Sequence, residues 1–174
     1  MIDRREWLSL TAGAAAWTLL PGFLRAETTT AKLIERAIPS SGEKVPVIGL
    51  GSSASFSQVA RSADITALRE VMKTMIDAGA RVFDTAPGYG ASEDVAGSIA
   101  SDLGISRKIF WATKVNVAGR GEGAKADPAS ARAQIESSFA KLKVPKIDLI
   151  QVHNLADVPT HLAVLNEMKK NGRV

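Results

Sequence analysis

The chain has 174 residues, of which 45% are hydrophobic and 23% charged, values typical of one folded domain with an apolar core. The net charge of +4 comes from 22 Lys and Arg against 18 Asp and Glu. These charges are scattered along the sequence, which argues against nucleic-acid binding. With no cysteine and only two histidines, the sequence excludes disulfides, thiolate metal sites and a cysteine nucleophile, and it disfavours a histidine-rich zinc site.

The first segment, residues 1–26, resembles a twin-arginine export signal. Arg4 and Arg5 precede an uncharged stretch, 7–24, that is rich in Ala, Gly and Thr and is interrupted by a proline. A membrane-spanning helix needs about 20 strongly apolar residues, so a cleavable signal is the preferred interpretation. An uncleaved signal acting as an anchor is the alternative. We therefore expect export through the twin-arginine (Tat) machinery to the periplasm, with residues 27–37 as a linker.

The pattern after the linker predicts a hairpin, a strand and a helix. Residues 38–46 carry a Ser-Gly pair between two short extended segments, which is typical of a hairpin turn. The apolar run 47–51 ends in glycine and predicts a first buried strand. A helical period follows over 64–78, with Asp64 placed to cap the helix and Gly79 to end it. Its apolar residues share one face: Ile65, Leu68, Met72, Met75 and Ile76.

Three further strand-helix units follow in the same order. The predicted strands are residues 81–84, 108–114 and 147–153. The predicted helices are 92–103, a helix that opens at Asp127-Pro128 and buries Ile135, Phe139 and Leu142, and 159–170. Ser92 is a natural N-cap, and Pro128 suits a first helical turn. In the last helix Leu162, Leu165 and Met168 form the apolar stripe, while His161 lies on the polar side and is expected at the surface.

Alternating strands and helices at this spacing predict an α/β fold with a parallel sheet and right-handed crossovers. A doubly wound sheet would carry the fingerprint G-x-G-x-x-G after its first strand. Residues 49–54 offer only the variant that ends in alanine, and no helix starts there. The preferred fold class is therefore a (β/α)8 TIM barrel. Such a barrel has eight units and about 250 residues, so we expect 38–174 to be its N-terminal half, truncated before strand five.

Polar side chains follow three of the predicted strands, at or just past the point where each strand ends. They are Asp84, Tyr89, Lys114 and His153. The carboxyl ends of parallel strands are where α/β proteins place their chemistry, and an acid, a phenol, an amine and an imidazole together can move a proton. Taken singly, the acid could cap a turn, the tyrosine could lie at the surface and the histidine in the core. The lysine is harder to dismiss, because a lysine at a strand end is costly without a partner.

At these residues the sequence resembles the aldo-keto reductases. The matching segments cover nearly everything after the signal: 38–42, 49–51, 83–90, 113–114, 148–153 and 168–174. The most specific is Asp-Thr-Ala-x-x-Tyr-Gly, within 83–90. The resemblance implies an oxidoreductase that reduces aldehyde or ketone carbonyls to alcohols with hydride from NADPH, with NADH not excluded. The expected partners are a small-molecule carbonyl substrate and, through residues 1–26, the export machinery.

The resemblance also implies a role for each of the four polar residues. Tyr89 is the general acid that gives its phenolic proton to the forming alkoxide. Lys114 places a positive charge beside the phenol, and Asp84 holds that lysine. His153 hydrogen-bonds the carbonyl oxygen and orients it. Because a free phenol has a pKa of about 10, which matches neutral pH poorly, a neighbouring ammonium has a clear physical purpose.

The family resemblance places the nicotinamide end of the cofactor near four residues: Gly51, Ser52, Asp84 and His153. The residues that hold the rest of the cofactor belong, in this family, to strands five to eight, so we expect the fragment alone to be inactive. The alternatives are an NADPH-binding barrel with little turnover, a non-functional remnant and a metal-dependent barrel hydrolase. The last is disfavoured because Lys114 would repel a cation, and no metal ligands are predicted.

Overall fold

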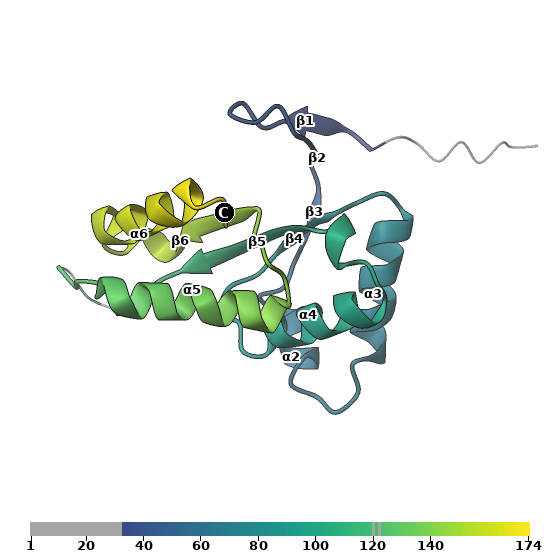
Figure 1. The fold of residues 1–174 in the computed structure, drawn as a ribbon. Coiled ribbons are helices and arrows are strands. Elements are labelled where there is room, and N and C mark those ends of the chain that lie inside the picture. The colour runs from purple at the N-terminus through teal and green to yellow at the C-terminus, as the bar shows by residue number, and fades with distance from the viewer. Residues whose placement is uncertain (1–32, 120, 122) are drawn as a thin grey trace, which may run out of the picture. The chain divides into compact units, whose positions relative to one another are not determined.

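The computed structural model describes residues 33–119, 121 and 123–174. The predicted export signal and most of the predicted linker lie outside these residues. A parallel sheet organises the described part, and its strands pair in the order β3-β4-β5-β6 (Figure 1). They are β3 (Gly49–Gly51), β4 (Val82–Asp84), β5 (Phe110–Val115) and β6 (Leu149–Val152). The pairing of consecutive strands confirms the predicted strand-helix alternation and leaves β3 and β6 at the edges.

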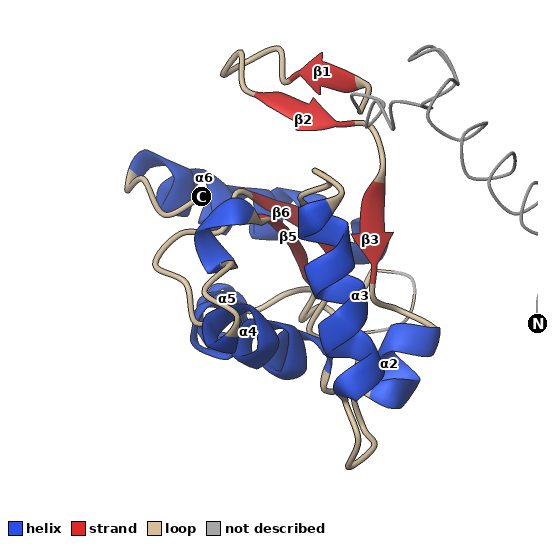
Figure 2. Ribbon diagram, turned by 90° about the vertical axis from the view of Figure 1, so that its right-hand side faces the viewer, coloured by secondary structure: helices blue, strands red, loops and turns tan. Residues whose placement is uncertain are grey.

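A two-stranded antiparallel hairpin precedes the sheet and stands at the end where β3 begins (Figure 2). It joins β1 (Glu35–Ala37) to β2 (Lys44–Pro46), and its turn uses Gly42 with φ +73°, a conformation that glycine adopts without strain. The guanidinium of Arg81 ties the hairpin to β4 through the Glu43 carboxylate at 3.0 Å. Strand β1 falls inside the predicted linker, which therefore ends too late, because an exposed strand of this length has no apolar alternation to detect.

The helices lie close to their predicted positions except for the first, which begins at Ser55, directly after the segment where no helix was expected. They are α2 (Ser55–Val59), α3 (Thr66–Asp77), α4 (Ser92–Asp102), α5 (Pro128–Leu142) and α6 (Val158–Lys170), with 3₁₀ turns η2 (Ser106–Lys108) and η3 (His153–Leu155). Asp127 caps α5 as predicted, since its Oδ2 accepts from the Ser130 N–H at 2.8 Å. Ser92 is not the N-cap of α4. It is the first helical residue, and its hydroxyl donates to the Ser52 carbonyl at 3.0 Å.

The apolar core lies between the sheet and the helices. Three aromatic rings meet edge to face at its centre, with centroid distances of 5.3 Å for Phe56–Phe83 and 5.5 Å for Phe83–Trp111, an arrangement that aromatic rings favour. Helices α4 and α5 pack closely at Gly97, where a side chain would overlap the backbone carbonyl of Lys141. Every helix in the described part of the chain is too short or too polar to cross a membrane.

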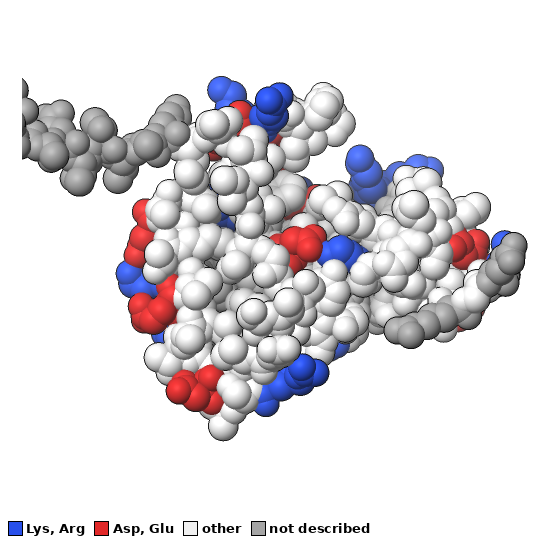
Figure 3. Space-filling view, turned by 180° about the vertical axis from the view of Figure 1, so that it is seen from behind, with Lys and Arg blue, Asp and Glu red and all other residues white. Residues whose placement is uncertain are grey.

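The last helix departs from its predicted stripe. Leu165 and Met168 are buried as expected, but Leu162 is 46% exposed. It borders a hollow of about 410 Å³ between α6, β6 and the hairpin, where Leu149 is exposed as well. The buried face of α6 is therefore rotated relative to the prediction, and it consists of His161, Val164, Leu165 and Met168. Charges of both signs are interspersed over the rear face of the molecule (Figure 3).

Candidate active site

The strand register brings an acid and a lysine together at the carboxyl end of the sheet. Asp84 ends β4 opposite Ala112 of β5, and Lys114 lies two residues further along β5 on the same face. The Lys114 Nζ donates to Asp84 Oδ2 at 2.7 Å and to the Thr85 carbonyl at 2.8 Å. The lysine side chain is 11% exposed and the aspartate side chain 40%. A charge-assisted pair of this kind holds the ammonium in one position.

The tyrosine and the histidine join this pair. The turn after β4 carries Tyr89, and its N–H donates to the Ala86 carbonyl at 3.0 Å. The Lys114 Nζ lies 5.0 Å from the centre of the Tyr89 ring, within the range of a cation–π contact. His153 follows β6 and meets the same ring edge to face, with centroids 5.7 Å apart and planes at 87°. The structure thus brings together all four residues that the sequence predicted.

Burial and two neighbouring charges set the protonation of His153. Partial burial lowers the pKa of His153 below 6.5, the Lys114 ammonium lowers it further, and the Asp84 carboxylate acts in the opposite direction. Burial acts this way because it penalises the charged imidazolium. At neutral pH the ring is therefore neutral, and it can donate one hydrogen bond without carrying a charge.

The four residues predicted to contact the cofactor differ in their exposure at the open face of the sheet. Gly51 ends β3 next to Asp84, is exposed, and has no atom within 4 Å of where a side chain would begin. Asp84 and His153 are partly exposed. Ser52 is fully buried, and its backbone is occupied by Asp84 and Ser92. The Ser52 prediction is therefore corrected, because strand alternation turns its side chain toward the helices and away from the open face.

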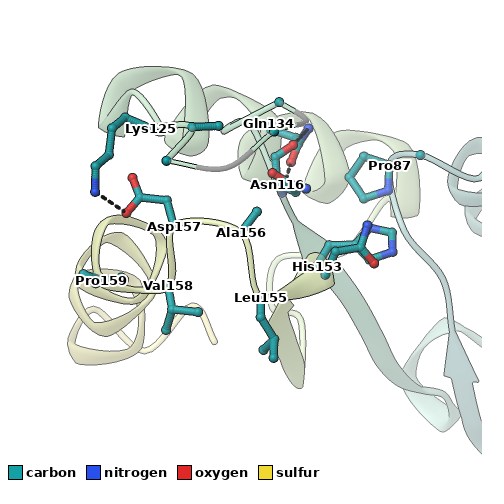
Figure 4. A pocket seen from close by; sticks show the side chains of 16 residues that line it. Pro87, Asn116, Lys125, Gln134, His153, Leu155, Ala156, Asp157, Val158 and Pro159 are labelled. Atoms are coloured by element: carbon teal, nitrogen blue, oxygen red, sulfur yellow. Dashed lines mark hydrogen bonds and ion pairs between the residues drawn. The ribbon is translucent and has the colours of Figure 1, made fainter.

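A hollow of about 950 Å³ adjoins the site, between the loop after β5 and the turn from η3 into α6. Figure 4 shows His153 and Pro87 at one end of it, and the ion pair between Lys125 and Asp157 at the other. The Asp157 side chain is 2% exposed and accepts from the Ala126 N–H at 2.9 Å, so the pair joins the two walls. Sequence analysis missed Asp157, because nothing in its local pattern marks a contact with a loop 31 residues away.

The histidine in α6 corrects another prediction. His161 was expected at the surface but is fully buried. Its Nδ1 lies 2.8 Å from the Ala156 carbonyl, and its Nε2 lies 3.1 Å from the Val117 N–H. A carbonyl only accepts, so Nδ1 carries the proton and Nε2 accepts from Val117. The ring thus bonds the β5 loop to the start of α6. It shares the buried face of that helix with Val164, Leu165 and Met168, so the prediction assigned the apolar stripe to the wrong face.

A buried polar layer behind the site was also missed. Glu93, near the start of α4, is 1% exposed, and its Oε1 accepts from the Thr113 hydroxyl at 2.7 Å. An acid at this position is also favoured in the first turn of an exposed helix, so the sequence gives no sign of its burial. Among the described residues no cluster of three or more His, Asp or Glu is arranged to hold a metal ion.

The segment that carries these residues is similar to proteins of a known family. The model of the Aldo/keto reductase family matches residues 47–174, most of the chain. The chain belongs to the aldo/keto reductase family. It is 27% identical to aldo-keto reductase YhdN of Bacillus subtilis over 145 residues, which are 79% of this chain and 44% of that protein. It is 31% identical to aflatoxin B1 aldehyde reductase member 2 of Rattus norvegicus over 99 residues, which are 55% of this chain and 26% of that one.

A solved structure of the family resembles this one. The aldo-keto reductase AKR11C1 from Bacillus halodurans, in its holo form, aligns with a TM-score of 0.63 and 25% identity, covering 81% of this chain and 48% of that one. The likeness confirms the predicted fold class: the four-stranded parallel sheet corresponds to part of an aldo-keto reductase (β/α)8 barrel. The chain spans about half the length of these relatives or less.

Proposed function

We propose that the protein is an NAD(P)H-dependent oxidoreductase that reduces aldehyde or ketone carbonyls to alcohols, with Tyr89 as general acid. One observation carries the proposal: the Lys114 ammonium, held by Asp84 at 2.7 Å, lies 5.0 Å from the Tyr89 ring that His153 contacts. Membership of the aldo/keto reductase family supports it. So do the names of the relatives, which are an aldo-keto reductase and an aldehyde reductase.

The open face beside Asp84 fits the reacting end of a nicotinamide cofactor. Gly51 leaves the end of β3 clear of side-chain atoms, and Asp84 and His153 border the same face. These three residues would line the nicotinamide end of NADPH, our preferred cofactor, with NADH as the alternative. When bound, the cofactor supplies a hydride to the carbonyl carbon. The hydride makes the carbonyl oxygen negative, so the chain has to supply a proton and a hydrogen bond at that oxygen.

Tyr89 supplies the proton. As its phenol gives up that proton, the phenolic oxygen becomes negative, and the Lys114 ammonium stabilises this charge. Asp84 fixes the position of the ammonium through their ion pair. The Thr85 carbonyl accepts a second bond from the same ammonium and removes further freedom. These contacts make the proton donor part of a fixed arrangement.

His153 orients the substrate. Its imidazole is neutral at neutral pH, because burial and Lys114 both lower its pKa. A neutral ring donates a hydrogen bond to the carbonyl oxygen without competing with Tyr89 for proton transfer. The edge-to-face contact with Tyr89 keeps the two donors on one side of the bound carbonyl.

The first experiment measures NADPH binding by fluorescence titration on the chain without residues 1–26. Aldehyde turnover is then measured on the complete gene product. Because its relatives are about twice as long, we propose that turnover requires strands beyond the four described here. Tyr89→Phe should lower kcat by a factor on the order of 100 to 10,000 and leave NADPH binding unchanged. Binding without turnover in the complete wild-type protein would overturn the reductase and indicate a binding module.

We propose further that residues 1–26 direct export to the periplasm by the twin-arginine route. The adjacent Arg4 and Arg5 before an uncharged stretch support this proposal. Replacing both arginines with lysine keeps the charge and should retain the protein in the cytoplasm, as measured by cell fractionation. A variant that is exported as efficiently as wild type would exclude this route, and a membrane-bound full-length product would indicate an uncleaved anchor.

A further inference from the structure

Glu93 is the one charged residue that is fully buried in the described part of the chain. A buried carboxyl group is costly unless polar groups compensate it. No lysine, arginine or histidine pairs with it among the described residues. Its Oε1 accepts from the Thr113 hydroxyl at 2.7 Å, and its Oε2 has no hydrogen-bond partner there. The proposed reaction gives this carboxyl no chemical task, so its position needs another explanation.

The bond to Thr113 connects the two segments that carry the proton donor and its ammonium. Thr113 directly precedes Lys114 in β5. Glu93 lies four residues after Tyr89, at the start of α4. Because alternate residues of a strand face opposite sides, Thr113 points toward the helices while Lys114 points toward the open face. The Glu93–Thr113 bond therefore connects the start of α4, which follows Tyr89 in the chain, to the part of β5 that carries Lys114.

A second buried bond fixes the same segment from the other side. The Ser92 hydroxyl donates to the Ser52 carbonyl at 3.0 Å, and the Ser92 N–H donates to the Tyr89 carbonyl at 3.2 Å. The turn that carries Tyr89 is thus held against β3 through Ser92 and against β5 through Glu93. Both bonds lie behind the site, where no solvent competes for the donors.

We propose that Glu93 is a positioning residue for the proton donor: by accepting from Thr113 it holds the start of α4 against β5 and so sets the distance between Tyr89 and Lys114. Glu93 touches neither the substrate nor the phenol, and it acts through Thr113. The stabilisation of a charge by an ammonium falls with their separation. A misplacement of about 1 Å can lower a rate on the order of 100-fold. The catalytic meaning of this role rests on the proposed function.

The test uses the only tyrosine in the sequence. Incorporation of 3-fluorotyrosine into the full chain gives one ¹⁹F resonance, which reports the surroundings of Tyr89 without turnover. Glu93→Ala and Thr113→Val should each move this resonance toward its frequency in urea-unfolded chain. Glu93→Gln keeps an oxygen that accepts from Thr113, so its resonance should stay at the wild-type position. Ile135→Val, in the core of α5, is the control for a general loss of packing.

Three outcomes would overturn the proposal. The resonance of Glu93→Ala and Thr113→Val could stay at the wild-type position. It could move as far in Ile135→Val, which would make the effect one of stability. It could move as far in Glu93→Gln, which would exclude the bond to Thr113 as the cause. If the aldehyde assay fails while the ¹⁹F result holds, the proposed function is wrong and the positioning role of Glu93 stands.

Discussion

The carboxyl end of the sheet carries two rows of side chains that come from the same strands and differ in character. The row on the open face contains charges, with Asp84 paired to Lys114. The row on the helix side contains the hydroxyl groups of Ser52, Thr85 and Thr113, all buried. Strand alternation alone separates them. The comparison shows that two adjacent residues of one strand can have different tasks: one side chain belongs to the candidate active site, and the next supports the sheet from behind.

The largest effect is expected in the charged row. Lys114→Met removes the ammonium that stabilises the developing phenolate, so aldehyde reduction by the complete gene product should fall by a factor on the order of 100 to 10,000. Far-UV circular dichroism should remain that of wild type. Lys108→Met removes an equal charge from the exposed turn η2 and should retain activity. Full activity of Lys114→Met would show that the Asp84–Lys114 ion pair is not needed for the reaction.

An intermediate effect, on the free energy of unfolding, is expected in the hydroxyl row. It should be larger at Thr113 than at Thr85. Thr113→Val leaves the buried Glu93 carboxyl without its donor, which should cost about 1–3 kcal/mol of unfolding free energy. Thr85→Val replaces a hydroxyl whose oxygen has no hydrogen-bond partner, so it should leave stability close to that of wild type. Urea denaturation of the two variants measures the difference. Equal losses would mean that the bond to Glu93 contributes nothing of its own.

The smallest effect is expected on the pKa of His153, which the charged row influences. The pKa of His153 lies below 6.5, and Lys114 is one cause, so Lys114→Met should raise it toward that value in an NMR titration of the imidazole. In the unfolded chain the ring is protonated more readily than in the folded protein. The unfolded state therefore gains protons first, and stability is lost as pH falls through 6.5. An unchanged titration in Lys114→Met would show that burial alone lowers the pKa.

Much of the fold follows from local pattern, because periodicity records which face of an element is buried. The strands ending at Asp84 and near Lys114, and the helix capped by Asp127, lie close to their predicted positions. The four site residues were predicted from strand ends together with the family resemblance. Tyr89 needed that resemblance most, because a tyrosine in a turn has no local signal of its own.

Three of the errors concern polar side chains that are buried through hydrogen bonds to distant segments. Glu93 looks like an ordinary first-turn acid, and its partner Thr113 lies 20 residues away. His161 was assigned to the polar side of its helix, yet it lies on the buried face and is bonded to Val117, 44 residues away. Ser92 was predicted to cap its own helix and instead bonds the backbone of β3. Such contacts become visible only when the strands are placed side by side.

The burial of His161 has a consequence for chemical modification. The chain has no cysteine and two histidines, so imidazole chemistry can address two positions at most. His161 is fully buried with both ring nitrogens bonded, while His153 is partly exposed and neutral at neutral pH. Of the two histidines, only His153 should therefore react with a reagent that acylates neutral imidazoles, and its adduct is followed by the absorbance of N-acylimidazole. The described part of the chain thus presents one accessible imidazole, and it lies at the candidate active site.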